Sequence, residues 1–186
     1  MQCPKDKQIS LVEGQLAAQL AAHHCPECEG VWIPGVEYDS WQVQQPLAES
    51  LSALIDQALE TNVDRSPFDA RAALCPECNA YLARAKVSAK TPFYVERCPN
   101  CKGIWCDRGE WNTLQMLSLH TVIDQMFLGE WQTRTREREQ LAQERRATIE
   151  KLGAELAAQI FELADVLKQH PNGDFGVAYL MRRCDK

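Results

Sequence analysis

Hydrophobic side chains recur at helical spacing in one stretch of the first half of the chain. Between residues 47 and 59 they lie three or four positions apart, which places them on one face of an amphipathic helix. They are Leu47, Leu51, Leu54, Ile55, Ala58 and Leu59. Turn-forming residues between Asn62 and Pro67 end the pattern. We expect this helix either to cover a neighbouring domain or to bind a partner.

A second helical pattern fills the C-terminal part of the chain. Residues 112–128 are mostly apolar, residues 131–151 are dominated by Arg and Glu, and one apolar stripe follows. The stripe steps by three and four residues over just under three heptads, which is the spacing of a coiled coil. Its members are Ile149, Leu152, Leu156, Ile160, Leu163 and Leu167. Pro171 and Gly173 are expected to end the helix, and the pattern after Phe175 is ambiguous.

An internal repeat organises the rest of the chain. The string Cys-Pro-x-Cys-x-Gly-hydrophobic-Trp occurs at residues 25–32 and again, 73 residues later, at residues 98–105. Cys3-Pro4 recurs as Cys75-Pro76, 72 residues later. The predicted organisation is a first repeat over residues 1–41, a linker with the amphipathic helix over 42–70, a second repeat over 71–112, a helical tail over 113–170 and a C-terminal segment over 171–186.

Composition indicates whether the cysteines bind metal or form disulfides. The chain has 186 residues, of which 45% are hydrophobic and 25% charged, as in an ordinary folded protein. Nine are cysteines, an odd number, and the N-terminus shows no apolar segment of a secretion signal. We therefore expect metal-bound thiolates in a reducing, cytoplasmic compartment rather than disulfides. No run approaches the roughly 18 apolar residues of a membrane helix, so no membrane association is expected.

The second repeat carries a four-thiolate zinc pattern. Two C-x-x-C pairs, Cys75/Cys78 and Cys98/Cys101, are separated by nineteen residues. Each pair forms a tight knuckle, and two knuckles complete a tetrahedron around zinc at zinc–sulfur distances of about 2.3 Å. Residues 80–84 and 93–97, between the pairs, look like the two short strands of a hairpin.

A ribbon this small needs its metal. It cannot bury enough apolar surface to fold alone, so zinc would supply much of its folding energy. Two unmetallated cysteine pairs are the alternative reading of the spacing. A rubredoxin-like iron site is a further alternative, because four thiolates accept either metal.

The first repeat carries a degraded version of the same site. Cys3, Cys25 and Cys28 are present, but Asp6 stands where the fourth cysteine would be. A carboxylate oxygen is an acceptable zinc ligand, so we predict a second zinc site with Asp6 as its fourth ligand. The neighbouring histidines, His23 and His24, compete for that role.

These motifs resemble the transcription-factor-IIB-type zinc-ribbon family (zf-TFIIB). The second repeat matches the family motif best, through Cys75, Cys78, Cys98, Cys101, Gly103, Trp105, Asp107, Gly109 and Glu110. The first repeat is similar to the variant that opens Cys-Pro-x-Asp, through Cys3, Asp6, Cys25, Cys28, Gly30, Trp32 and Glu37. The resemblance implies a small metal-bound α+β fold: two zinc ribbons, each a short β-hairpin with zinc knuckles, followed by a long α-helical tail. It also implies two zinc ions, the first less firmly held.

Three features of the two repeats depart from the family motif or leave a choice open. Cys106 stands where the family usually has an apolar residue; we expect a small buried side chain, with a redox thiol or substitute ligand as the alternative. Residues 33–36 replace the Asp-x-Gly stretch in the first ribbon. Trp32 and Trp105 are expected to cap the metal knuckles and pack on the following helix, or else to bind a partner as exposed aromatics.

Charge and motifs narrow the function classes. The net charge is −6 overall but about +3 over residues 71–111, so a broad positive field for nucleic acid is absent. No phosphate-binding loop, catalytic triad or H-E-x-x-H motif is present, so no enzyme activity is expected. Thiol redox catalysis by C-x-x-C is disfavoured because paired knuckles bind metal. We expect a non-catalytic protein-interaction or assembly adaptor, whose helical tail binds a protein partner or forms a homodimer.

The alternative function is binding of nucleic acid or RNA polymerase through the second ribbon, in a transcription-related role. The family name suggests transcription, by analogy with a ribbon that docks on RNA polymerase. Aromatic and basic side chains can together hold a single strand. The cations are Arg71, Arg84, Lys86, Lys90, Arg97, Lys102 and Arg108, and the aromatic residues are Tyr81, Phe93, Tyr94 and Trp105. An ordinary solvated ribbon surface would carry the same residues.

Overall fold

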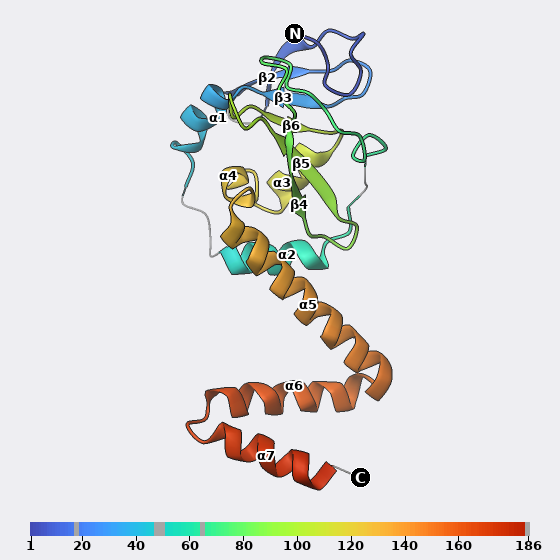
Figure 1. Cartoon of the computed structure of the whole chain (residues 1–186), viewed down its shortest axis with the longest axis vertical. Helices are drawn as coiled ribbons and strands as arrows, with labels where there is room; N and C mark the ends of the chain where they lie inside the picture. The colour runs from blue at the N-terminus through green and yellow to red at the C-terminus, as the bar shows by residue number, and fades with distance from the viewer. Residues whose placement is uncertain (17–18, 47–50, 64–65, 185–186) are drawn as a thin grey trace. The chain divides into compact units, whose positions relative to one another are not determined.

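The structure is a computed structural model that describes residues 1–16, 19–46, 51–63 and 66–184 (Figure 1). It divides into a ribbon unit over residues 1–138 and a helical unit over residues 139–186. The elements are β1 (Val12–Leu16), β2 (Leu20–His24), β3 (Val31–Ile33), α1 (Gly35–Gln42), α2 (Leu51–Glu60), β4 (Ala83–Val87), β5 (Phe93–Arg97), β6 (Ile104–Cys106), α3 (Glu110–Met116), α4 (Ile123–Met126), α5 (Gly129–Leu152), α6 (Ala154–Gln169) and α7 (Gly173–Cys184). None of these helices is long and apolar enough to cross a membrane.

The two ribbons share one antiparallel sheet. Its strand order is β1-β2-β3-β6-β5-β4, so the first ribbon supplies one half and the second ribbon the other. The halves join where β3 pairs with β6, and Trp32 lies opposite Trp105 in that pair. Because each ribbon contributes its third strand to the junction, the strand order of one half mirrors that of the other. The repeat seen in the sequence is therefore also a repeat within a single sheet.

The two faces of this sheet have different coverings. Successive side chains of a strand point to opposite faces, and the junction strands follow this rule. Val31, Ile33, Ile104 and Cys106 belong to the core that also contains helix residues, whereas Trp32 and Trp105 belong to the cluster that contains the metal-site cysteines. The sheet thus has a helix-covered face and a metal face, and Cys106, fully buried on the helix side, is the small core residue that was expected.

Each junction tryptophan packs against a glycine of the other ribbon. A Cβ atom added to Gly30 would lie 2.2 Å from Cζ2 of Trp105, and one added to Gly103 would lie 2.1 Å from Cζ2 of Trp32. Both tryptophans have 0% exposed surface. The expected capping of metal knuckles is confirmed, but each tryptophan caps the knuckle of the opposite ribbon. The expected packing on the following helix is wrong, because both rings lie on the metal face of the sheet. The alternative of an exposed, partner-binding aromatic is wrong.

Helices from the first ribbon, from the linker and from the residues after the second ribbon form the core of the other face. The amphipathic linker helix is confirmed as α2, whose Leu54, Ile55 and Ala58 are buried in that core. Leu47, the first residue of the predicted stripe, lies outside the described residues. α3, α4 and the segment between them add apolar side chains to the same core: Leu114, Leu117, Leu119, Ile123 and Met126. Residues predicted as the beginning of the tail are thus packed against the sheet.

The structure corrects two sequence predictions. The strand expected at residues 80–84 begins at Ala83, because residues 80–82 complete the Cys75–Cys78 turn: Cys75 N–H donates to Ala80 O at 2.8 Å and Leu82 N–H donates to Ala73 O. The apolar stripe expected as one helix is divided, since Gly153 has φ of 80° and ψ of 159° and separates α5 from α6. Glycine adopts this backbone conformation without the steric cost that other residues incur.

The helical unit contains the end of α5, followed by α6 and α7. α6 ends at Gln169, where the predicted stop at Pro171 is confirmed, and the chain returns along it as α7. The chain after the turn lies close to the end of α6. A Cβ on Gly173 would lie 1.8 Å from the backbone oxygen of Leu167, and one on Gly176 would lie 2.6 Å from the side-chain atom Cδ2 of Leu167. These two glycines permit the antiparallel hairpin that Figure 1 shows at the C-terminus.

Replacing Gly103 with alanine should destabilise the ribbon unit by about 1–3 kcal/mol, because the new methyl group overlaps the buried Trp32 ring. All five tryptophans lie between residues 32 and 131, so tryptophan fluorescence during urea unfolding reports on this unit alone. Gly129→Ala is the matched control, since no atom lies within 4 Å of its added Cβ. Equal effects of the two substitutions would contradict the packing described.

Candidate metal centres

The three C-x-x-C turns of the ribbon unit have the same backbone geometry. In each, the N–H of the first cysteine donates at 2.8 Å to the carbonyl oxygen five residues later, at Gly30, Ala80 or Gly103. The residue after the second cysteine is left-handed in every case: φ is 57° at Glu29, 58° at Asn79 and 62° at Lys102. This tight turn directs two sulfurs to one side, and the proline after the first cysteine restricts the chain before it closes.

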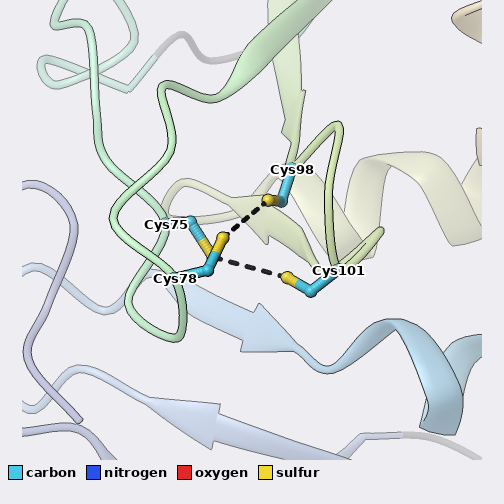
Figure 2. A group of neighbouring side chains, drawn as sticks. All are labelled: Cys75, Cys78, Cys98 and Cys101. Atoms are coloured by element: carbon cyan, nitrogen blue, oxygen red, sulfur yellow. Dashed lines mark hydrogen bonds between the residues drawn. The ribbon is translucent and has the colours of Figure 1, made fainter.

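The four cysteines of the second ribbon converge on one point. Figure 2 shows Cys75 and Cys78 on one turn facing Cys98 and Cys101 on the other. The Cys75–Cys101 and Cys78–Cys98 sulfur atoms are each 3.4 Å apart, and all four sulfurs lie within 4.8 Å of one another. A tetrahedral zinc site with bonds of about 2.3 Å has sulfurs about 3.8 Å apart, so small side-chain movements accommodate the ion. The predicted zinc site is therefore assembled by the fold.

The thiols of this group differ in how tightly they hold their protons. Burial acts to raise the pKa of Cys98, but hydrogen bonds from the N–H groups of Cys101 and Asn100 outweigh it and lower the pKa to about 7. Burial raises the pKa of Cys75 to about 11. Zinc binds thiolates, so its entry displaces the remaining thiol protons and relieves the close sulfur–sulfur contacts.

The first ribbon brings together three sulfurs. Those of Cys3, Cys25 and Cys28 lie within 4.8 Å of one another and are buried. Cys3 and Cys28 sulfurs are 3.6 Å apart, and a hydrogen bond from the Cys28 thiol is the main cause that lowers the pKa of Cys3 to about 6. Three thiolates leave one position of a zinc tetrahedron for another ligand. The protein thus has two zinc sites, of which the first has three cysteines.

Asp6 lies beside this group, with its carboxylate turned into its own loop. Its N–H donates to the Cys3 sulfur at 3.3 Å, while its side chain accepts a hydrogen bond from Gln8 N–H at 3.1 Å. The loop is one residue longer than the C-x-x-C turns, since Cys3 N–H donates to Ile9 O, six residues on. This aspartate turn satisfies the carboxylate locally, so the structure leaves Asp6 outside the three-sulfur group. Asp6 as the fourth ligand stays a prediction.

The two alternative ligands lie on β2. His23 pairs with Trp32 and His24 with Val31 across the β2–β3 ladder. A Cβ on Gly14 would lie 2.6 Å from Cδ2 of His24, so this ring covers the neighbouring strand. Neither histidine belongs to the groups of potential ligands found among the described residues.

The sequence analysis missed a pair of contacts that link each metal loop to the opposite ribbon. Lys5, between Cys3 and Asp6, is fully buried and donates to Glu96 at 2.6 Å. Glu77, at the equivalent position between Cys75 and Cys78, accepts from Trp32 Nε1 at 2.9 Å. The sequence repeat shows that the two positions are equivalent. Their contacts depend on the shared sheet, so the sequence could not predict them.

Lys5 enters a buried carboxylate cluster that consists of Asp69, Glu96, Asp107 and Glu110. In addition to its contact with Glu96, the Lys5 ammonium lies 3.6 Å from Asp107 and donates to Arg71 O at 2.8 Å. Arg84 approaches the cluster from the other side, 3.3 Å from Asp69. The cluster thus holds two cations between its four carboxylates, and the ammonium from the first ribbon neutralises carboxylates of the second.

Two motif residues of the second ribbon order the beginning of α3 within this cluster. Asp107 accepts from Trp105 Nε1 at 2.7 Å, and Glu110 accepts from Asp107 N–H at 2.8 Å. Burial, followed by the repulsion of Asp107, raises the pKa of Glu110 to about 9. Burial likewise raises the pKa of Glu96 to about 7, against the opposing attraction of Lys5. The family motif therefore has a structural role around the junction tryptophan.

The side chains that favoured nucleic-acid binding are mostly engaged within the protein. Phe93 and Trp105 are fully buried, and only Tyr81 of the four aromatics is highly exposed, at 76%. Five of the seven cations contact an acidic or aromatic partner: Arg71 over Phe68, Arg84 with Asp69, Lys90 with Glu60, Arg97 with Asp124 and Arg108 with Glu29. A continuous surface of free cations and stacked aromatics is not formed by these residues.

Fold and cysteine geometry together define a double zinc ribbon. Comparison with protein families agrees: residues 2–42 and 74–115 each match the family described as Transcription factor zinc-finger, which contains zinc ribbons of the TFIIB type. The two matched segments lie in tandem and together cover just under half of the chain. No curated protein and no solved structure gives a significant match.

Zinc analysis should find two ions per chain, and Cys98→Ser should remove at least one of them. The substitution removes a thiolate from the four-sulfur site and leaves the first ribbon's cysteines intact. Inductively coupled plasma mass spectrometry of the desalted protein measures the content. Cys106→Ser is the matched control, because this cysteine is buried away from both groups.

The first site has its own test, in which zinc affinity is measured by competition with a chelator. Asp6→Ala should weaken zinc binding there, because it removes the predicted fourth ligand, whereas Gln8→Ala should not. Unchanged affinity in Asp6→Ala would remove Asp6 from the ligand set and direct attention to His23 and His24. A wild-type protein that folds with no bound metal would contradict both sites.

Glu110→Gln should make the stability of the ribbon unit less dependent on pH. The folded-state pKa of about 9 lies above the ordinary value of 4.5, so the folded protein holds this proton more tightly than the unfolded chain. The free energy of unfolding therefore falls as pH rises from about 4.5 to 9, and glutamine removes this contribution. Urea unfolding at pH 5, 7 and 9 measures it. Glu37→Gln, the exposed equivalent in the first ribbon, should leave the pH profile unchanged.

Proposed function

We propose that this protein is a zinc-dependent, non-catalytic interaction and assembly adaptor. Zinc holds the ribbon unit together, and the helical unit provides the binding surface. The four-thiolate site supports a structural role for the metal, since four protein ligands leave no open position for substrate or water. The free thiols support a reducing compartment, the cytoplasm, as its location.

The distribution of exposed apolar side chains carries the proposal. Of nineteen large hydrophobic side chains that are exposed in the described part of the chain, twelve lie in the helical unit, which is about a quarter of the sequence. Monomeric proteins rarely expose such a concentration of apolar surface, and those patches that exist are usually binding sites. The helical unit therefore favours an interaction role.

The alternative, binding of nucleic acid or RNA polymerase by the second ribbon, has less support. Its positive charge is largely compensated by acidic neighbours, and two of its four aromatic side chains are fully buried. Tyr81 is the exposed aromatic that favours it. A gel-shift assay with single- and double-stranded nucleic acid tests this alternative directly, and salt-sensitive binding that is lost in Tyr81→Ala would favour it over the adaptor.

The adaptor proposal is tested by affinity capture with the full zinc-loaded chain and mass spectrometric identification. The tagged wild-type chain should retain a specific partner, which is either another protein or an untagged copy of this chain. Leu163→Asp should reduce the amount of retained partner at least tenfold. Zinc content should not change, because Leu163 lies in the helical unit. Capture that is identical in wild type and Leu163→Asp would contradict the adaptor function of this surface.

A further inference from the structure

The helical unit has no core of its own. Among its described residues only Ala157 and Gly173 are buried. Leu156, Ile160 and Leu163 of the predicted stripe are 40–49% exposed, although they lie on the same α6 face that was expected to be covered. A pair of helices cannot bury enough apolar surface to be stable by itself, so this surface requires another element.

α6 and α7 together form an apolar groove. It has a volume of about 830 Å³ and runs along the hairpin from its closed end, at Pro171, to Cys184. Its apolar walls are Ile160, Leu163 and Leu167 from α6 and Val177, Leu180 and Met181 from α7. A long groove between two helices accepts the apolar face of a further helix.

The charges at the two ends of α6 and α7 suit an antiparallel pairing of these helices. α6 begins with Glu155 and ends with Lys168; α7 begins with Asp174 and ends with Arg182 and Arg183. Each helix is thus acidic at its beginning and basic at its end. Any antiparallel pairing of these helices places opposite charges side by side at both ends, whereas a parallel pairing places like charges together.

We propose that the groove is filled by the helical unit of a second copy of this chain, so that the protein is a homodimer held by an antiparallel four-helix bundle. The inference rests on the proposed interaction function and names its partner. Two identical hairpins supply matching apolar faces and matching end charges, which is what a twofold interface requires. Bundles of four antiparallel helices are a stable way to cover such faces.

The oligomeric state of the full zinc-loaded chain tests the proposal. Sedimentation velocity should give twice the chain mass of 21.1 kDa. Leu163→Asp and Met181→Asp place a charge in the groove and should each raise the dimer dissociation constant at least tenfold. Phe175→Asp is the matched control: Phe175 lies on α7 and is 71% exposed, but it does not line the groove. This variant should remain dimeric.

Charge reversal tests the antiparallel arrangement. Arg182→Glu with Arg183→Glu makes α7 acidic at both ends and should weaken the dimer. Hydrogen exchange of the wild-type protein supplies a readout that needs no variant: dilution below the dissociation constant should speed exchange in α6 and α7 and leave the sheet unchanged.

Three results would overturn the inference: a wild-type monomer at every concentration, a dimer that persists in both groove variants, or a dimer that Phe175→Asp disrupts equally. A wild-type monomer that still captures another protein through Leu163 would refute the second copy as occupant and leave the adaptor function standing. A dimer disrupted by the groove variants, with no other protein captured, supports assembly of this chain with itself.

Discussion

The ribbon unit depends on the reciprocal contact of two tryptophans with two glycines across the β3–β6 junction. Trp32 occupies the space that a side chain on Gly103 would need, and Trp105 does the same above Gly30. The metal knuckle of each ribbon therefore forms part of the packing surface of the other ribbon. Lys5 and Glu77 add to the contacts between the ribbons, because each extends from a metal loop to a partner in the opposite half of the sheet. Zinc binding and sheet formation are consequently coupled across the two ribbons.

In this arrangement the metal sites are part of the packing of the ribbon unit. The carboxylate cluster, the junction tryptophans and the cysteine loops stabilise one face of the sheet, and α2, α3 and α4 cover the other. The apolar surface that remains exposed is concentrated on α6 and α7. A dimer formed there would carry two zinc-ribbon units, and simultaneous engagement of both would raise any weak affinity for a common target well beyond that of one unit through effective concentration.

Local chemistry was predictable from the sequence, whereas contacts between the repeats were not. Cysteine spacing identified the four-sulfur site, and the three- and four-residue steps identified α2 and α6, because both depend on neighbours in the chain. The sequence analysis expected two separate ribbons and could not foresee the shared sheet, since pairing of β3 with β6 joins residues more than 70 positions apart. Gly153 interrupts the apolar stripe without changing its spacing. The longer Asp6 loop, in which the carboxylate accepts from Gln8 N–H, was not evident from the register of Asp6 with Cys78.

Native-state hydrogen exchange of the zinc-loaded protein tests most directly whether the two ribbons form one cooperative structure. Hydrogen-bonded amides of β2 and β3 in the first ribbon should open with the same free energy as those of β5 and β6 in the second, and both should fall together when zinc is partly removed by a chelator. Two distinct opening free energies, with the first ribbon exchanging while the second stays protected, would show that the ribbons fold independently and would contradict the central role of the tryptophan–glycine junction.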